Sequence, residues 1–94
     1  MILHYEGIQI PMTLYKDDSV IDTLDKLKEF NLAPRGGDNV YLKMSGSYYF
    51  YETPWEHDDM VEFEIEFNGE KSPFQGYFKN KTKQIFIKRA LVKI

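Results

Sequence analysis

The amino-acid sequence predicts an α+β fold, in which a mostly antiparallel sheet of about six to seven strands carries one amphipathic helix, over residues 19–31, packed on one face. Three observations predict it: alternating apolar and acidic residues over 61–67, an Asn-Gly pair directly after them, and apolar residues at helical spacing between 20 and 30. The chain has 94 residues, of which 43% are hydrophobic, enough for one core. We therefore expect a single domain over residues 1–94.

The stretch from 61 to 67 is the clearest strand in the sequence. A period of two places apolar residues on one face of a strand and the intervening residues on the other. One face of this strand should therefore belong to the core, and the other should be a line of negative charge. The apolar residues are Val61, Phe63, Ile65 and Phe67, and the acidic residues are Glu62, Glu64 and Glu66.

The first part of the chain predicts a hairpin followed by a helix. Alternating apolar residues on both sides of Glu6-Gly7 predict two strands joined by a tight turn. Next, Asp17-Asp18-Ser19 precedes apolar residues spaced by three and four, and Asp22 lies four residues before Lys26. These signals predict a helix of about three turns.

Further hairpins follow in the second half of the chain. Residues 40–44 and 48–52 flank a Ser-Gly-Ser turn, and the second arm contains four aromatic residues in a row, Tyr48 to Tyr51. Asn68-Gly69 is the strongest turn signal in the sequence. Residues 85–94 are apolar on both faces, which is typical of a strand central to a sheet or buried at an interface.

The order of the first elements resembles the start of a ubiquitin-like β-grasp domain. It comprises a strand from Met1, a glycine turn, a strand ending near Leu14, and Asp18-Ser19-Val20-Ile21 opening a helix that runs into Asn31-Leu32-Ala33-Pro34. The resemblance covers roughly the first 45 residues and implies a β-grasp-like arrangement there. Conjugated modifiers end in a glycine pair, whereas this sequence ends Leu91-Val92-Lys93-Ile94, so we do not expect a conjugatable modifier.

Composition excludes several classes of function. The chain contains no cysteine, and its first residues form neither a signal peptide nor a membrane span, so we expect a cytoplasmic protein that does not enter a membrane. There is no nucleotide-binding loop, and the adjacent His57, Asp58 and Asp59 lack the spacing of a metal site. With two histidines and no G-x-S-x-G motif, we expect no catalytic residue, no cofactor and no bound metal ion, and hence no enzyme.

The charges are separated along the chain. From Glu52 to Glu70 there are eight acidic residues and no Lys or Arg, while Lys79 to Ile94 holds six basic residues and no acidic one. In one interpretation the two segments form neighbouring strands whose exposed faces make cross-strand ion pairs. In the other, the protein has two faces of opposite sign, one or both of which bind a partner.

Our first functional hypothesis is a small non-catalytic protein-binding module, such as an inhibitor or adaptor of the kind that phages and bacteria encode. An acidic surface flanked by aromatic residues would bind a protein with a basic surface, including by mimicry of nucleic-acid phosphates. A homo-oligomer, formed through the exposed terminal strand, is left open. The predicted partner-binding residues are Tyr49, Tyr51, Trp55, Glu56, Asp58, Asp59, Glu62, Glu64 and Glu66.

The alternative hypothesis is nucleic-acid binding through the basic carboxyl-terminal hairpin. Its lysines and arginine would contact phosphates, and Tyr77 or Phe86 would stack on bases, an arrangement suited to single strands. The net charge of −3 opposes this association. The predicted residues are Lys79, Lys81, Lys83, Lys88 and Arg89.

Overall fold

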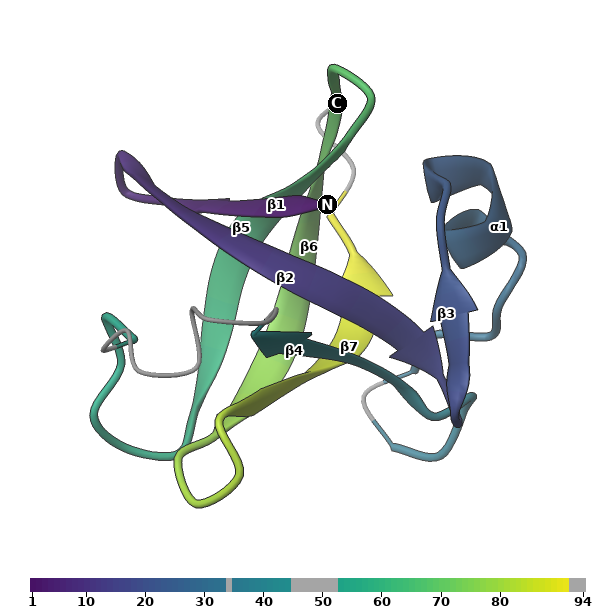
Figure 1. Ribbon diagram of the computed structural model, residues 1–94. Helices are drawn as coiled ribbons and strands as arrows, with labels where there is room; N and C mark the ends of the chain where they lie inside the picture. The colour runs from purple at the N-terminus through teal and green to yellow at the C-terminus, as the bar shows by residue number, and fades with distance from the viewer. Residues whose placement is uncertain (34, 45–52, 92–94) are drawn as a thin grey trace.

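The computed structural model describes residues 1–33, 35–44 and 53–91, and shows strands that curl around a common axis with one short helix to the side (Figure 1). The elements, in chain order, are β1 (Ile2–Tyr5), β2 (Ile8–Lys16), β3 (Ser19–Ile21), α1 (Leu24–Lys28), β4 (Val40–Met44), β5 (Asp59–Phe67), β6 (Glu70–Lys79) and β7 (Gln84–Ala90).

The strands form a closed antiparallel barrel of six strands in the order β1-β5-β6-β7-β4-β2, which closes because β1 also pairs with β2. The nine residues of β2 make this closure possible. Its first half, Ile8 to Pro11, pairs with β1, and its second half, Met12 to Lys16, pairs with β4. The three-residue strand β3 lies outside the ring and pairs with the end of β2.

The predicted α+β class is wrong, and so is the predicted helix over 19–31. Residues Ser19–Ile21 form β3, and the helix is confined to Leu24–Lys28. Its amino-terminal cap is Thr23, whose hydroxyl accepts a hydrogen bond from the backbone nitrogen of Lys26 at 3.1 Å. The capping signal therefore lies four residues later than Ser19, because Asp17 takes a positive φ of 54° and turns the chain back to pair with β2.

Among the described residues, no amphipathic helix packs over a sheet. Instead α1 lies at one end of the barrel, where its Leu24 lines a small hollow together with Phe67 at the end of β5. The β-grasp-like start is corrected for the same reason. A third strand stands where the helix was expected to open, and the sheet closes into a barrel.

The barrel interior is filled by side chains that alternate along each strand. The prediction for 61–67 is confirmed, because the four apolar residues of this run are at most 9% exposed. In a barrel every strand contributes alternate residues to the interior, so each strand shows the same period of two. The other buried hydrophobic side chains of the six strands are Leu3, Ile10, Met12, Leu14, Val40, Leu42, Phe74, Phe78, Ile85 and Ile87.

The order of the last strands separates the acidic and basic segments. β7 lies between β6 and β4, so the expectation that residues 85–94 include a central strand is confirmed for the described part, 85–90. However, β6 lies between β5 and β7. The interpretation that the acidic and basic segments form neighbouring, charge-paired strands is therefore wrong.

Gly76 allows β6 and β7 to approach each other inside the barrel. It sits at a register shift between Gln75 and Gly76, where a β-bulge interrupts the β6–β7 ladder. A Cβ atom at this position would lie 2.7 Å from Cγ2 of Ile85 and 2.9 Å from the backbone oxygen of Phe86. There is thus no room for a side chain.

We expect Gly76→Ala to lower the free energy of unfolding by about 1–3 kcal/mol, because the added methyl group overpacks a site bounded by backbone. Urea unfolding followed by far-UV circular dichroism measures the change. Ser72→Ala, on the same strand, is the matched control and should change stability by no more than about 0.5 kcal/mol. An unchanged urea midpoint for Gly76→Ala would contradict the tight β6–β7 contact.

Candidate functional site

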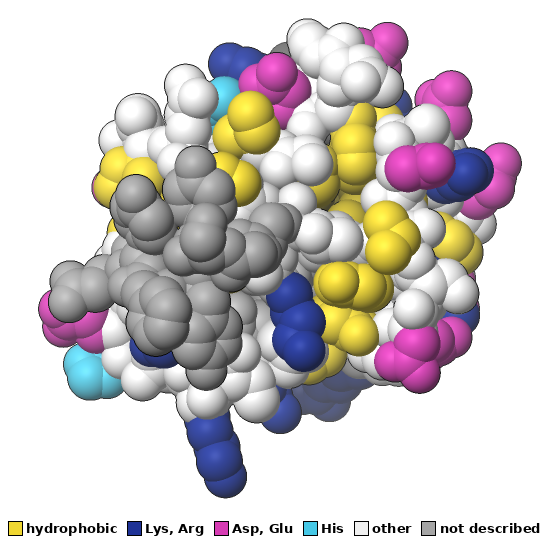
Figure 2. Space-filling view, viewed as in Figure 1, with side chains coloured by type: hydrophobic (Ala, Val, Ile, Leu, Met, Phe, Trp, Pro, Cys, Tyr) yellow, Lys and Arg dark blue, Asp and Glu magenta, His cyan; other side chains and the backbone are white. Residues whose placement is uncertain are grey.

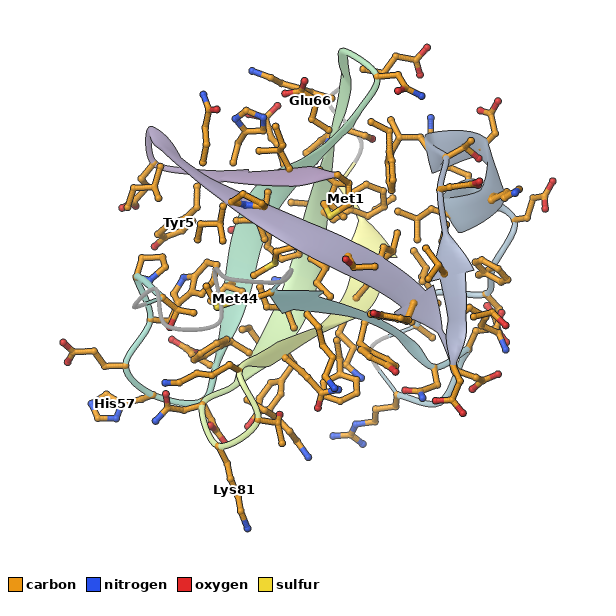
Figure 3. The ribbon with its side chains drawn as sticks, in the orientation of Figure 1. Met1, Tyr5, Met44, His57, Glu66 and Lys81 are labelled. Carbon is orange, nitrogen blue, oxygen red and sulfur yellow. The ribbon has the colours of Figure 1, made fainter. Side chains whose placement is uncertain are left out.

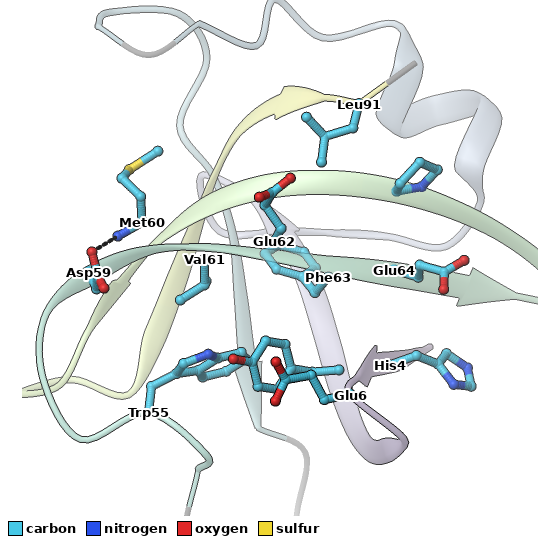
Figure 4. A pocket seen from close by; sticks show the side chains of 12 residues that line it. His4, Glu6, Trp55, Asp59, Met60, Val61, Glu62, Phe63, Glu64 and Leu91 are labelled. Atoms are coloured by element: carbon cyan, nitrogen blue, oxygen red, sulfur yellow. Dashed lines mark hydrogen bonds between the residues drawn. The ribbon is translucent and has the colours of Figure 1, made fainter. Parts of the chain in front are cut away.

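The barrel has an open seam between β1 and β5. β6 pairs with β5 from Asp59 to Phe67, whereas β1 pairs with β5 only from Glu64 to Glu66. The strand β1 is this short because the hairpin turn follows at once, with positive φ angles of 45° at Glu6 and 81° at Gly7. A cleft of about 520 Å³ lies along the part of β5 that β1 does not reach (Figure 4).

The ladder pattern shows which peptide groups of β5 face this cleft. Met1 and Met12 exchange two backbone hydrogen bonds, at 3.1 and 3.3 Å, so odd residues of β1 face β2 and even residues face β5. His4 therefore exchanges hydrogen bonds with Glu64, and the next residues of β5 that face the same side are Glu62 and Met60.

Hydrogen bonds at both ends of this stretch agree with the assignment. Pro73 of β6 is opposite Glu64 of β5. The backbone oxygen of Pro73 accepts a hydrogen bond from the backbone nitrogen of Leu91 at 2.9 Å, so this peptide group points away from β5. The nitrogen of Met60 donates to its neighbour's carboxylate, Asp59 Oδ1, at 2.8 Å. Within the described chain, the cleft-facing edge of β5 from Asp59 to Phe63 has no strand partner.

Trp55 forms one wall of the cleft. The centre of its ring lies 4.8 Å from the centre of the Tyr5 ring and 5.3 Å from that of the Phe78 ring, and the residue is only 8% exposed. The hydroxyl of Thr53 donates to the backbone oxygen of Trp55 at 2.9 Å. The indole Nε1 of Trp55 is buried without a hydrogen-bond partner in the part of the chain that the structure describes.

The cleft is acidic. Its lining includes Glu6, Asp59, Glu62 and Glu64, together with His4, and no Lys or Arg. In Figure 4, Val61 points toward Trp55, whereas Glu62 points away from it, so the glutamates stand on the outer side of the strand. Acidic groups gathered without a counter-charge produce a negative potential that attracts cations.

The three glutamates of β5 differ in their neighbours on β6. Glu62 is opposite Gln75 and Glu64 is opposite Pro73, neither of which is charged. Glu66 is opposite Lys71, and its Oε1 lies 2.6 Å from Nε2 of His4 on the other side (Figure 3). Glu62 therefore has no basic residue opposite it, Glu64 is opposite His4 on β1 and lines a hollow with Lys71, and Glu66 is already engaged.

The remaining residues of the predicted acidic surface lie around the mouth of the barrel or outside the described chain. Glu56 is exposed, and Oδ1 of Asp58 accepts from the backbone nitrogen of Asn80 at 2.7 Å, which ties the connection before β5 to the turn after β6. Tyr49 and Tyr51 lie outside the described residues. Among the residues described, no three or more His, Cys, Asp or Glu side chains are grouped so that they could hold a metal ion.

The predicted basic residues do not form one cluster. Lys79 and Lys88 both place Nζ near the ring of Phe86, at 5.7 and 5.9 Å, and Lys81 projects from the β6–β7 turn (Figure 3). Lys83, in the same turn, donates to Oδ1 of Asn80 and lies 5.9 Å from the ring of Phe78. Arg89 lines a separate hollow beside α1.

Sequence reasoning missed the contribution of β1 to the cleft. His4, Tyr5 and Glu6 lie more than fifty positions before the acidic strand, and only closure of the barrel brings them there. The one local signal was Glu6-Gly7, which ends β1 early and so opens the seam.

Comparison of the chain with protein-family models, with curated proteins and with solved structures finds no match in any of the three. In the described residues, no helix has the length and apolar character needed to cross a membrane.

We expect Trp55→Ala to lower the free energy of unfolding by about 3–5 kcal/mol, because it leaves a cavity between Tyr5 and Phe78. Trp55→Phe should cost less than about 1.5 kcal/mol, since it keeps an aromatic ring and removes a buried N–H that lacks a partner. Guanidinium unfolding followed by far-UV circular dichroism compares the two. Equal stability of the two variants would show that the indole is not part of the core.

Proposed function

We propose that the protein is a non-catalytic binding module that takes an extended, basic segment of a partner protein into the cleft between β1 and β5. The observation that carries the proposal is the edge of β5 from Asp59 to Phe63, which lacks a strand partner in the described chain and borders an acidic cleft. An exposed strand edge is a template for an added strand, because its backbone donors and acceptors are in place.

The positions of the peptide groups support this mode of binding. The backbone of Glu62 and the carbonyl of Met60 face the cleft and would form hydrogen bonds with an added strand. The nitrogen of Met60 is held by Asp59, so an incoming strand would exchange bonds mainly with Glu62. The indole N–H of Trp55, buried at the cleft wall, is a further donor for a backbone oxygen of the ligand.

The charges support a basic ligand. Opposed residues on neighbouring antiparallel strands have Cβ atoms roughly 4.5–5.5 Å apart, so a Lys or Arg opposite Glu62 on an added strand would reach its carboxylate. Glu64 lies where β1 begins to pair with β5, so a long basic side chain at the end of the added strand would approach it diagonally. Because Glu62 is opposite the uncharged Gln75 on β6 and has no strand partner on the cleft side in the described chain, a basic residue would not have to displace an existing partner there. The negative field would also steer a basic partner toward the cleft, most strongly at low ionic strength.

An inhibitor or adaptor with this mode of binding fits a cytoplasmic protein, because the chain has no cysteine to stabilise it in an oxidising compartment. Mimicry of nucleic acid is a narrower form of the same proposal, in which Glu62 and Glu64 stand for phosphates. Glu66 contributes less, because His4 already contacts its carboxylate.

The test uses a synthetic peptide of about seven residues in which Lys and Val alternate, with a peptide of alternating Glu and Val for comparison. We expect that only the lysine peptide binds, and that it shifts the backbone amide NMR signals of Met60 and Glu62. Glu62→Gln/Glu64→Gln should weaken binding about 3- to 30-fold in calorimetry, as expected for two exposed ion pairs of about 0.3–1 kcal/mol each.

The matched control is Asp25→Asn/Glu29→Gln, which removes the same number of charges from exposed positions at α1 and should leave binding unchanged. A lysine peptide with methylated backbone nitrogens should bind poorly, since it cannot form a ladder. Equal binding of the methylated peptide, or no NMR shift at Met60 and Glu62, would contradict strand addition.

A further inference from the structure

A row of apolar and aromatic side chains crosses the outside of the barrel. The register places Tyr15 opposite Tyr41, Tyr41 opposite Phe86, and Phe86 opposite Tyr77. At the two ends, Val20 of β3 is opposite Tyr15, and Met60 of β5 is opposite Tyr77. We call this row the outer belt, and its members in spatial order are Val20, Tyr15, Tyr41, Phe86, Tyr77 and Met60.

The outer belt faces away from the core. The residues that precede Tyr15 and Phe86 in their strands, Leu14 and Ile85, are fully buried, so the aromatic residues point outward. The four aromatic residues are half-buried, and the two ends are open, since Val20 is 60% and Met60 is 41% exposed. Contiguous apolar surface of this kind commonly marks an interaction site.

The rings are arranged as a series of neighbouring faces. The centres of the Tyr15 and Tyr41 rings are 5.3 Å apart with an angle of 20° between their planes, and those of Tyr41 and Phe86 are 5.9 Å apart at 46°. Burial, and after it the negative charges of Asp18 and Asp17, raise the pKa of the Tyr41 hydroxyl, which is neutral at physiological pH in either case. Asp17 and Asp18 follow Tyr15 in the turn to β3, so phosphates would be favoured at the Phe86 end of the row and not at the Tyr15 end.

Basic residues flank the middle of the outer belt. Lys79 and Lys88 each place Nζ within 6 Å of the centre of the Phe86 ring, and the exposed Lys43 lies two residues from Tyr41 on β4. Neither β4 nor β7 contains an Asp or Glu. Figure 2 shows hydrophobic side chains beside Lys or Arg side chains on the face that carries β2 and β4.

We infer that the middle of the outer belt binds single-stranded nucleic acid, with Tyr41, Phe86 and Tyr77 stacking on bases and Lys43, Lys79 and Lys88 contacting phosphates. Aromatic rings interleaved with cations form such a platform, because every base has a face that can stack and every nucleotide carries a phosphate. A duplex hides its base faces and would leave the rings unused. The acidic cleft beside β5 would repel the nucleic acid and so confine it to the surface of β4, β6 and β7.

This inference does not depend on the proposed peptide-binding cleft, which lies beside β5 and has the opposite charge. It also revises the sequence-based hypothesis of nucleic-acid binding. Lys79 and Lys88 stay in the predicted site, Tyr41 and Lys43 are added to it, and Arg89 lies at a separate hollow beside α1.

The test is fluorescence anisotropy with a labelled oligonucleotide of about fifteen thymidines, at a salt concentration of about 50 mM. We expect saturable binding that weakens as salt is raised. Lys79→Glu/Lys88→Glu should lower the affinity about tenfold or more, and Phe86→Ala should lower it about 5- to 150-fold through lost stacking. Circular dichroism and the thermal midpoint show which variants are folded. If Phe86→Ala is unfolded, Tyr41→Ala replaces it as the variant that tests stacking.

The matched control for charge is Lys26→Glu/Lys28→Glu on α1, which makes the same change away from the outer belt and should retain binding to within about twofold. Glu62→Gln/Glu64→Gln should also retain it, which separates this result from the test of the cleft. Absence of binding at low salt, or equal loss in the control and the outer-belt variants, would overturn the inference. So would self-association of the chain that Phe86→Ala abolishes, because the outer belt would then bind a second copy.

Discussion

The structure depends on the pairing of β1 with two strands at once. This strand of four residues, Ile2–Tyr5, lies between β2 and β5 and joins the first part of the barrel to the second. Leu3 is paired with Ile10 on one side and with Ile65 on the other, and all three are at most 6% exposed. Without this strand β5 and β2 would each have a free edge, and the barrel would be an open sheet.

The same constraint produces the candidate site. A closing strand of four residues cannot cover a nine-residue partner, so β5 keeps an edge that β1 does not reach. Trp55 packs between Tyr5 and Phe78 at this position and protects the interior where the ladder is missing. The cleft is thus a consequence of how the barrel closes, and it is lined by acids because the alternating strand β5 turns its glutamates outward.

The position of β6 separates the two charged segments. Its ten residues lie between the acidic β5 and the basic β7, so the glutamates of the one strand and the lysines of the other are not cross-strand neighbours. Each segment keeps its charge on its own part of the surface. In the described residues, the lysine–aspartate ion pairs join near neighbours in the sequence, Lys16 with Asp17 at 2.6 Å and Lys26 with Asp22 at 2.8 Å.

The sequence by itself determined the local pieces: the strand over 61–67 with its buried and charged faces, and the turns at Glu6-Gly7 and Asn68-Gly69, where the observed φ values are positive. These depend on a period of two and on turn chemistry, which act between near neighbours. The helix over 19–31 was wrong because Val20, Ile21 and Leu24 fit a helical spacing equally well, and pairing with β2 decided for a strand. Only the tertiary structure decided the closure of the barrel, the cleft and the outer belt, because each joins residues from strands far apart in the chain. His4 and Glu66, 62 positions apart, are in contact because the barrel closes, and no local pattern specifies that closure.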